Sequence, residues 1–215
     1  MSKAIAIMGE SGSGKTTSMR NLDPETTFYV DCDKKGLSWR GWREQYNGDK
    51  KNYLQTDFPQ VALQALRKVN ESEAYKHIKV IVFDTINGLM VADEMRRMGE
   101  KGYDKWQDLA ASIYGLIDYA LTVRDDLTPI FVAHTQTDHD DGGYMFTRIK
   151  TSGRKLDKIT LESKFSTVLL AKVNDGKYVF ETSSDHSTAK SPLGAFEDKE
   201  IDNDITTVLK ALEDF

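Results

Sequence analysis

The feature that most constrains this chain is a glycine-rich octapeptide close to its start. Residues 9–16, Gly-Glu-Ser-Gly-Ser-Gly-Lys-Thr, match the pattern G-x-x-x-x-G-K-[S/T] at every fixed position. An apolar run over residues 4–8 comes before them, and a helix is expected over residues 15–22, ended by Pro24. The glycines let successive backbone N–H groups turn towards an anion, and the start of a helix adds a positive end. Strand, loop and helix in this order predict a phosphate-binding loop.

The residue types in and near this loop point to a nucleoside triphosphate with Mg²⁺. Lys15 would reach the β- and γ-phosphates, and the Thr16 hydroxyl would bind the metal. Asp84 directly follows the apolar residues 80–83, so it falls at the carboxyl end of a strand and is the second candidate ligand; a helix-capping role is the alternative. The expected nucleotide-binding residues are Gly9, Glu10, Ser11, Gly12, Ser13, Gly14, Lys15, Thr16 and Thr17.

Polar residues end two further apolar strands and are candidates for the same site. Asp31 and Asp33 follow residues 28–30, and either acid would orient an attacking water. His134 follows residues 130–133 and would contact the γ-phosphate. A turn or capping role accounts equally well for each of these side chains.

Apolar strands that alternate with amphipathic helices predict an α/β fold with a mostly parallel central sheet flanked by helices. Asn174-Asp175-Gly176 predicts an antiparallel hairpin near the C-terminus, between residues 167–173 and 178–182. Without repeats or linkers, a single domain is expected over residues 1–215. The expected strands are residues 4–8, 28–30, 80–83 and 130–133, and the expected helices are residues 15–22, 59–69, 104–123 and 201–212.

Charge and composition leave several classes of partner open. The net charge of −5 is matched by residues 197–215 alone, an acidic C-terminal segment that is expected to end in a helix. The remainder is neutral overall, so local basic stretches are free to contact nucleic acid. Cys32 is the single cysteine, which excludes an internal disulfide and suits a reducing cytoplasm. No apolar run is long enough to cross a membrane, so no membrane partner is expected.

Four blocks beyond the glycine-rich loop carry a resemblance to a known family. With that loop, the chain resembles the phage-encoded RecA-like ATPases, AAA-family nucleotide-binding proteins related to the Sak-type single-strand annealing ATPases. The resemblance extends over essentially the whole chain and implies a RecA-like P-loop NTPase fold, ATP hydrolysis and location in the host cell cytoplasm. The blocks are Val-Asp-Cys-Asp at 30–33, Ile-Val-Phe-Asp-Thr at 81–85, Phe-Val-Ala-His at 131–134 and Thr-Ala-Lys-Ser-Pro-Leu-Gly at 188–194.

The resemblance also implies roles for individual residues. Asp84 matches the Walker B acid, and Asp33 stands where the family has a catalytic glutamate, one methylene longer. His134 takes the place of a glutamine that senses the γ-phosphate. Lys190 resembles a basic finger presented to the nucleotide of a neighbouring subunit, which implies a homo-oligomeric ring or filament. The catalytic residues expected on this basis are Lys15, Asp33, Asp84, His134 and Lys190.

In RecA-like proteins the segment after the sensor strand faces single-stranded DNA. The corresponding residues here, 135–158, are expected to form a mobile loop that combines bases with aromatic side chains, a pattern suited to single strands. A solvated charged surface is the alternative. A single-strand-binding protein is a further candidate partner. The candidate DNA contacts are Arg148, Lys150, Arg154 and Lys155.

The function expected from these features is that of an ATPase in phage DNA recombination or single-strand annealing. Its nucleotide would control oligomerisation and binding to single-stranded DNA. One alternative is a small-molecule or nucleoside kinase, with Asp31 and Asp33 as substrate-binding acids. The other is a slow nucleotide-dependent switch for a partner protein, favoured by the short Asp33 side chain.

Overall fold

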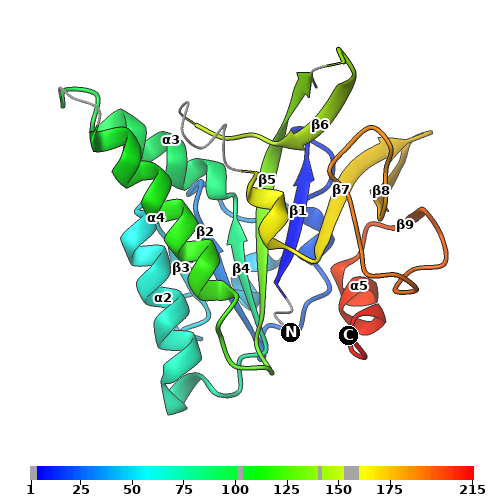
Figure 1. Ribbon diagram of the computed structural model, residues 1–215. Helices are drawn as coiled ribbons and strands as arrows, with labels where there is room; N and C mark the ends of the chain where they lie inside the picture. Colours follow the sequence, from blue (N-terminus) through cyan, green and yellow to red (C-terminus); the bar gives the residue numbers. More distant parts are fainter. Residues whose placement is uncertain (1–3, 101–103, 140–141, 153–159) are drawn as a thin grey trace.

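The computed structural model describes residues 4–100, 104–139, 142–152 and 160–215, and is built around one large β-sheet (Figure 1). Among these residues the strand order is β3-β2-β4-β5-β1-β7-β8-β9, and β6 pairs with β5. The strands are β1 Ile5–Gly9, β2 Thr27–Asp31, β3 Tyr53–Gln55, β4 Val80–Asp84, β5 Thr128–His139, β6 Met145–Ile149, β7 Thr167–Asn174, β8 Lys177–Glu181 and β9 Glu200–Asp202.

Six of these strands, from β3 to β7 in the sheet order, run parallel. Their carboxyl ends therefore meet at one edge of the sheet, where ligands bind in open α/β folds. Strands β8 and β9 add antiparallel pairs beside β7, and β6 folds back on the extended end of β5. The predicted α/β fold, mostly parallel with a C-terminal antiparallel hairpin, is confirmed.

Helices cover both faces of the sheet. On one face lie α2 (Pro59–Glu71), α3 (Ile86–Arg96) and α4 (Asp104–Ala120), side by side in Figure 1. On the other face lie the short α1 (Trp42–Gln45) and α5 (Ile205–Ala211), which contacts the 3₁₀ turn at Thr17–Met19. Alternate residues of β1 enter these two cores, which explains why its sequence is apolar throughout. None of the described helices has both the length and the apolar character that a membrane crossing requires.

The longer helices follow their sequence patterns. Helix α2 has proline in its first turn and buries one apolar face, which consists of Ala62, Ala65, Leu66 and Val69. Helix α4 buries Leu109, Ile113 and Ile117, which recur every four residues along one face. These periodic patterns are long enough to dominate the local choice of structure.

Two expected helices are wrong in extent. The helix expected over residues 15–22 is a single turn of 3₁₀-helix, η1 (Thr17–Met19), because the Ser18 hydroxyl bonds the Lys15 carbonyl and Pro24 follows closely. The helix expected from residue 201 begins at Ile205. Residues 200–202 pair with β8 instead, and the Asp204 side chain accepts from the Thr206 N–H and caps the helix.

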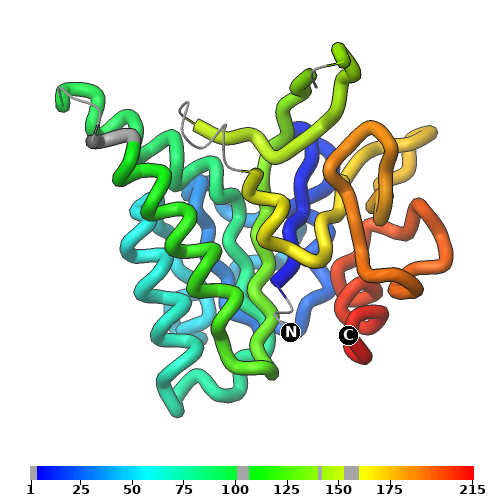
Figure 2. Tube along the Cα trace, in the orientation of Figure 1, coloured from blue at the N-terminus to red at the C-terminus, as the bar shows by residue number. Residues whose placement is uncertain are grey.

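The loop expected over residues 135–158 is also wrong in its first part. Strand β5 continues to His139, and β6 returns along it as an antiparallel hairpin. Figure 2 shows this hairpin projecting beyond the carboxyl edge of the sheet. Five consecutive residue pairs, from Thr135–Ile149 to His139–Met145, stabilise the hairpin, which charge and aromatic composition alone did not predict.

Candidate phosphate-binding site

A cavity of about 650 Å³ opens where the parallel strands end, beside the glycine-rich loop. This volume lies within the range of small-molecule sites in proteins. Residues of the loop form one wall, Thr85 after β4 and His134 within β5 form another, and β8, β9 and α5 complete it. Its lining residues are Ser11, Gly12, Gly14, Lys15, Thr16, Thr17, Arg20, Lys35, Ser38, Thr85, His134, Tyr178, Asp202, Asn203, Asp204 and Thr207.

The loop needs glycine at two positions for different reasons. A Cβ at Gly9 would lie 2.5 Å from the Ala171 carbonyl oxygen, so only glycine lets the end of β1 lie this close to β7. Gly14 has φ +89°, and a Cβ there would lie 2.8 Å from the Tyr178 ring. Glycine adopts such backbone angles without strain. Backbone conformation and close packing therefore both fix the loop, as the motif predicts.

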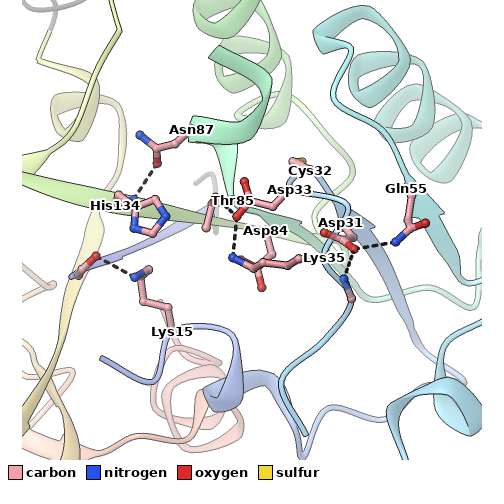
Figure 3. Close-up of polar contacts among 12 residues, drawn as sticks. Lys15, Asp31, Cys32, Asp33, Lys35, Gln55, Asp84, Thr85, Asn87 and His134 are labelled. Atoms are coloured by element: carbon pink, nitrogen blue, oxygen red, sulfur yellow. Dashed lines mark hydrogen bonds and ion pairs between the residues drawn. The ribbon is translucent and has the colours of Figure 1, made fainter. Parts of the chain in front are cut away.

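Lys15 is held inside this loop. Its Nζ donates hydrogen bonds to the carbonyl oxygens of Gly9 at 2.8 Å and Glu10 at 2.7 Å, one of which is drawn in Figure 3. The residue is only 6% exposed. Burial lowers the pKa of Lys15 to about 8, although the charge of Asp84 acts in the opposite direction. The ammonium group therefore lies beside the cavity with neutral partners that a phosphate would replace.

Asp84, the last residue of β4, is buried next to the loop. The Tyr29 hydroxyl donates to its Oδ2 at 2.6 Å, while its Oδ1 has no hydrogen-bond partner among the described residues. Burial raises the pKa of Asp84, and the side chains of Tyr29 and Thr16 oppose that shift. A buried carboxylate oxygen without a partner, close to a threonine hydroxyl, fits the oxygen ligands that Mg²⁺ prefers.

Tyr29 was not among the expected site residues. The pairing of β2 with β4 aligns Tyr29 with Val82 and Asp31 with Asp84, so Tyr29 lies diagonally across from Asp84 on one face. Its position two residues before Asp31 would have predicted this contact had the register been known.

The two acids after β2 have different surroundings. Asp31 is 1% exposed, and its Oδ2 accepts from the Gly36 N–H, the Tyr53 hydroxyl and the Gln55 amide. Asp33 accepts at Oδ2 from Lys35 Nζ at 2.6 Å and from the Thr85 hydroxyl at 2.9 Å (Figure 3). Because Lys35 and Thr85 line the cavity, Asp33 lies next to it, whereas Asp31 anchors the turn that follows β2.

His134 lines the cavity and is tied to two other residues. It pairs in register with Gly9, and its backbone N–H donates to Asn87 Oδ1 at 2.7 Å. The Lys150 N–H donates to the His134 carbonyl at 2.7 Å, and Asn87 Nδ2 donates to the Lys150 carbonyl at 2.8 Å. Burial, followed by the charge of Lys15, lowers the pKa of His134. No motif predicted Asn87, because its contacts join three separate segments.

Two expected binding residues make additional contacts around the loop, and a third is buried without a side-chain partner among the described residues. The Glu10 carboxylate accepts from the Thr135 hydroxyl at 2.6 Å, which joins the loop to β5. Thr17 shares a hydrogen bond of 2.9 Å with Ser38. Ser13 is buried, and its hydroxyl has no partner within the described part of the chain.

Among the residues expected to contact DNA or to act as the basic finger, those that the structure describes do not line the cavity. Arg148 is 8% exposed in β6, where its guanidinium lies 3.3 Å from Asp138. The side chain of Lys150 is exposed, while Arg154 and Lys155 lie outside the described residues. Lys190 forms two backbone hydrogen bonds with Val168 and has an exposed side chain that does not line the cavity.

Comparison with known proteins gives one family. The model of an AAA-domain family matches residues 1–193. No curated protein sequence is similar enough to the chain to be matched. The matched stretch contains the glycine-rich loop and the strands that carry Asp84 and His134. A match over most of the chain shows that it belongs to this AAA-domain family of P-loop ATPases.

Proposed function

We propose that the protein binds ATP with Mg²⁺, hydrolyses it, and acts on single-stranded DNA as a RecA-like recombination or annealing protein of phage type. The observation that carries this proposal is the hydrogen-bonded set of Asn87, His134 and Lys150. It joins the cavity to the base of the β5–β6 hairpin, beyond which the basic residues follow. A change at the cavity would therefore be transmitted to the segment proposed to contact DNA.

The groups around the cavity suit phosphoryl transfer to water. Thr16 and Asp84 would hold Mg²⁺, which neutralises charge on the phosphates when bound. Lys15 exchanges its two carbonyl partners for phosphate oxygens, and the loop N–H groups donate to the same ligand. The pKa of His134 is lowered in the free protein, and its imidazole is proposed to donate to the terminal phosphate.

Asp33 is the acid proposed to orient the attacking water. In the structure it is paired with Lys35, so the lysine has to leave the carboxylate before Asp33 can accept from water. A terminal phosphate offers Lys35 an alternative anionic partner, since Lys35 also lines the cavity. We therefore expect nucleotide binding to release Asp33, so that its carboxylate can accept a hydrogen bond from water.

The proposal also assigns residues to the contact with single-stranded DNA and to the contact with neighbouring subunits. The exposed Lys150 and the bases that follow it, Arg154 and Lys155, are the proposed phosphate contacts. Arg148 is buried beside Asp138, so we assign it to the support of the hairpin. Lys190 would act on the nucleotide of a neighbouring subunit in a ring or filament.

The experiment that tests the proposal is Mg²⁺-dependent phosphate release from ATP, measured with and without single-stranded DNA. Lys15→Ala is the blank, because it removes the cation that binds the phosphates while shortening a side chain that bonds only to backbone oxygens. We expect release that DNA stimulates and that Lys15→Ala abolishes in a folded protein. Equal release by a folded Lys15→Ala variant would contradict the site.

The alternatives give different results in the same assay. A kinase needs an acceptor, and Asp31, one of its two proposed substrate acids, is buried and already accepts three hydrogen bonds. Slow release that DNA does not change would favour the nucleotide switch instead. The ion pair between Asp33 and Lys35 is the observation that supports this second candidate.

A further inference from the structure

The cavity extends beyond the glycine-rich loop, along a wall for which the proposed phosphate chemistry has no use. This wall consists of Tyr178 in β8 and of residues 202–207, which lead from β9 into α5. The family match ends at residue 193, so most of this wall lies outside the matched sequence.

Asn203 is the least exposed polar residue of this wall that lacks a partner. It is 6% exposed, and its Nδ2 has no hydrogen-bond partner among the residues that the structure describes. Its backbone is fixed, because its carbonyl oxygen accepts from Arg20 Nη1 at 2.8 Å and the next residue caps α5. A buried N–H donor without an acceptor costs free energy. A ligand that supplies an acceptor would remove that cost.

Tyr178 provides a flat apolar surface next to Asn203. Its side chain is 53% exposed, although it lines the cavity. Both side chains converge on Gly14, since a Cβ there would lie 2.8 Å from Tyr178 Cδ1 and 3.0 Å from Asn203 Oδ1. Gly14 directly precedes Lys15, so an aromatic surface and an amide lie beside the phosphate-binding residues.

We propose that Tyr178 and Asn203 form the subsite for the base of the bound nucleotide. The adenine of ATP stacks on the Tyr178 ring, and Asn203 Nδ2 donates a hydrogen bond to one of its ring nitrogens. This inference rests on the proposed binding of ATP at the loop. It adds that the acidic C-terminal segment, beyond the matched family sequence, supplies base recognition.

Two ligands separate this subsite from the phosphate site. ATP carries a base, whereas inorganic tripolyphosphate offers the same phosphate chain without one. Equilibrium binding of both, with Mg²⁺, is measured for the wild type and for Asn203→Ala. We expect the affinity for ATP to fall about fivefold and the affinity for tripolyphosphate to stay unchanged, because one hydrogen bond to the base is lost.

The control is a substitution at Asn174, at the end of β7, and the second variant is a substitution at Tyr178 in β8. Asn174→Ala removes an exposed amide that bonds Glu200 at the hairpin turn, and neither affinity should change. Tyr178→Ala, at an exposed position that tolerates truncation, should weaken ATP about tenfold through the loss of stacking. Tyr178→Phe keeps the ring and should bind ATP as the wild type does.

The outcomes distinguish this inference from the proposed function. Unchanged ATP affinity in both Asn203→Ala and Tyr178→Ala would overturn the base subsite. Equal weakening of ATP and tripolyphosphate would overturn it as well, because the residues would then act on the phosphates or on the fold. If the wild type binds neither ligand, or Lys15→Ala binds both normally, the phosphate site itself is refuted.

Discussion

At the scale of single residues, the most informative group is Lys15, because its pKa of about 8 lies close to neutral pH. Phosphate oxygens favour the ammonium form, so bound ATP should raise this pKa. Below pH 7 the free lysine is already charged, and ATP binding takes up no proton at this group. Above pH 8 the free amine is mostly neutral, so binding requires proton uptake, and the affinity should fall by up to about tenfold per pH unit.

Titration calorimetry of ATP binding, in buffers that differ in ionisation enthalpy, measures this uptake directly. We expect it to be negligible at pH 6.5 and to approach one proton above pH 8. Lys15→Arg is the control, since a guanidinium stays charged throughout this range. A wild-type affinity that does not change between pH 7 and pH 9 would show that Lys15 is fully protonated in the free protein.

At the scale of secondary-structure elements, Asn87 joins three of them: α3, which carries it, β5 and the end of the β5–β6 hairpin. Asn87→Ala would leave the His134 N–H and the Lys150 carbonyl without these partners, at a cost of about 1–3 kcal/mol for each buried group. We expect ATP affinity to stay within about twofold and stimulation by single-stranded DNA to fall about tenfold. Phosphate release with and without DNA measures both effects.

Asn70→Ala is a matched control for this loss of stability. Asn70 also joins separate segments, since its amide donates to the Tyr119 hydroxyl and accepts from the Arg124 N–H, but it lies on α2 and does not line the cavity. Its loss should lower the free energy of unfolding and leave DNA stimulation intact. If both variants lose stimulation in proportion to their stability, Asn87 has no specific part in coupling.

The elements also show which parts of the fold the sequence could predict. The hairpin of β7 and β8 was predicted because the sequence Asn-Asp-Gly favours the positive φ angles of a tight turn. In the structure Asp175 and Gly176 have φ angles of 49° and 77°. Strands β3, β6 and β9 depend on partner strands that are distant or weakly patterned. Their short sequences carry no periodic signal, since the pairing partner supplies the hydrogen bonds.

The same distinction applies to the site. Lys15, Thr16 and His134 line one cavity, as the motif and the strand ends predicted. Tyr29, Asn87 and Asn203 were not predicted, because register, helix packing and the path of the C-terminal segment bring them there. A motif identifies residues that are close in sequence or at strand ends, whereas supporting contacts depend on tertiary structure.

At the scale of the whole molecule, the position of Lys190 leads to a prediction about assembly. Its backbone pairs with Val168 of β7, and Val168 in turn pairs with Ala6 of β1. Ala6 lies three residues before Gly9, where the glycine-rich loop begins. Its exposed side chain does not line the cavity of its own subunit. If Lys190 acts on a nucleotide, that nucleotide belongs to a neighbouring subunit, and Lys190→Ala should lower turnover at least about tenfold without weakening ATP binding.

Mixing two inactive variants tests whether the site is shared between subunits. Lys190→Ala supplies an intact loop, and Lys15→Ala supplies an intact Lys190, so interfaces that combine them in the right order regain both groups. We expect phosphate release to rise when the variants are mixed and to peak at intermediate ratios. As the control, Lys15→Ala alone should stay inactive at every protein concentration used. Sedimentation velocity with ATP shows whether subunits associate under these conditions. If mixed oligomers form and no ratio restores release, Lys190 does not complete a neighbour's site, and each subunit must hydrolyse ATP with its own residues alone.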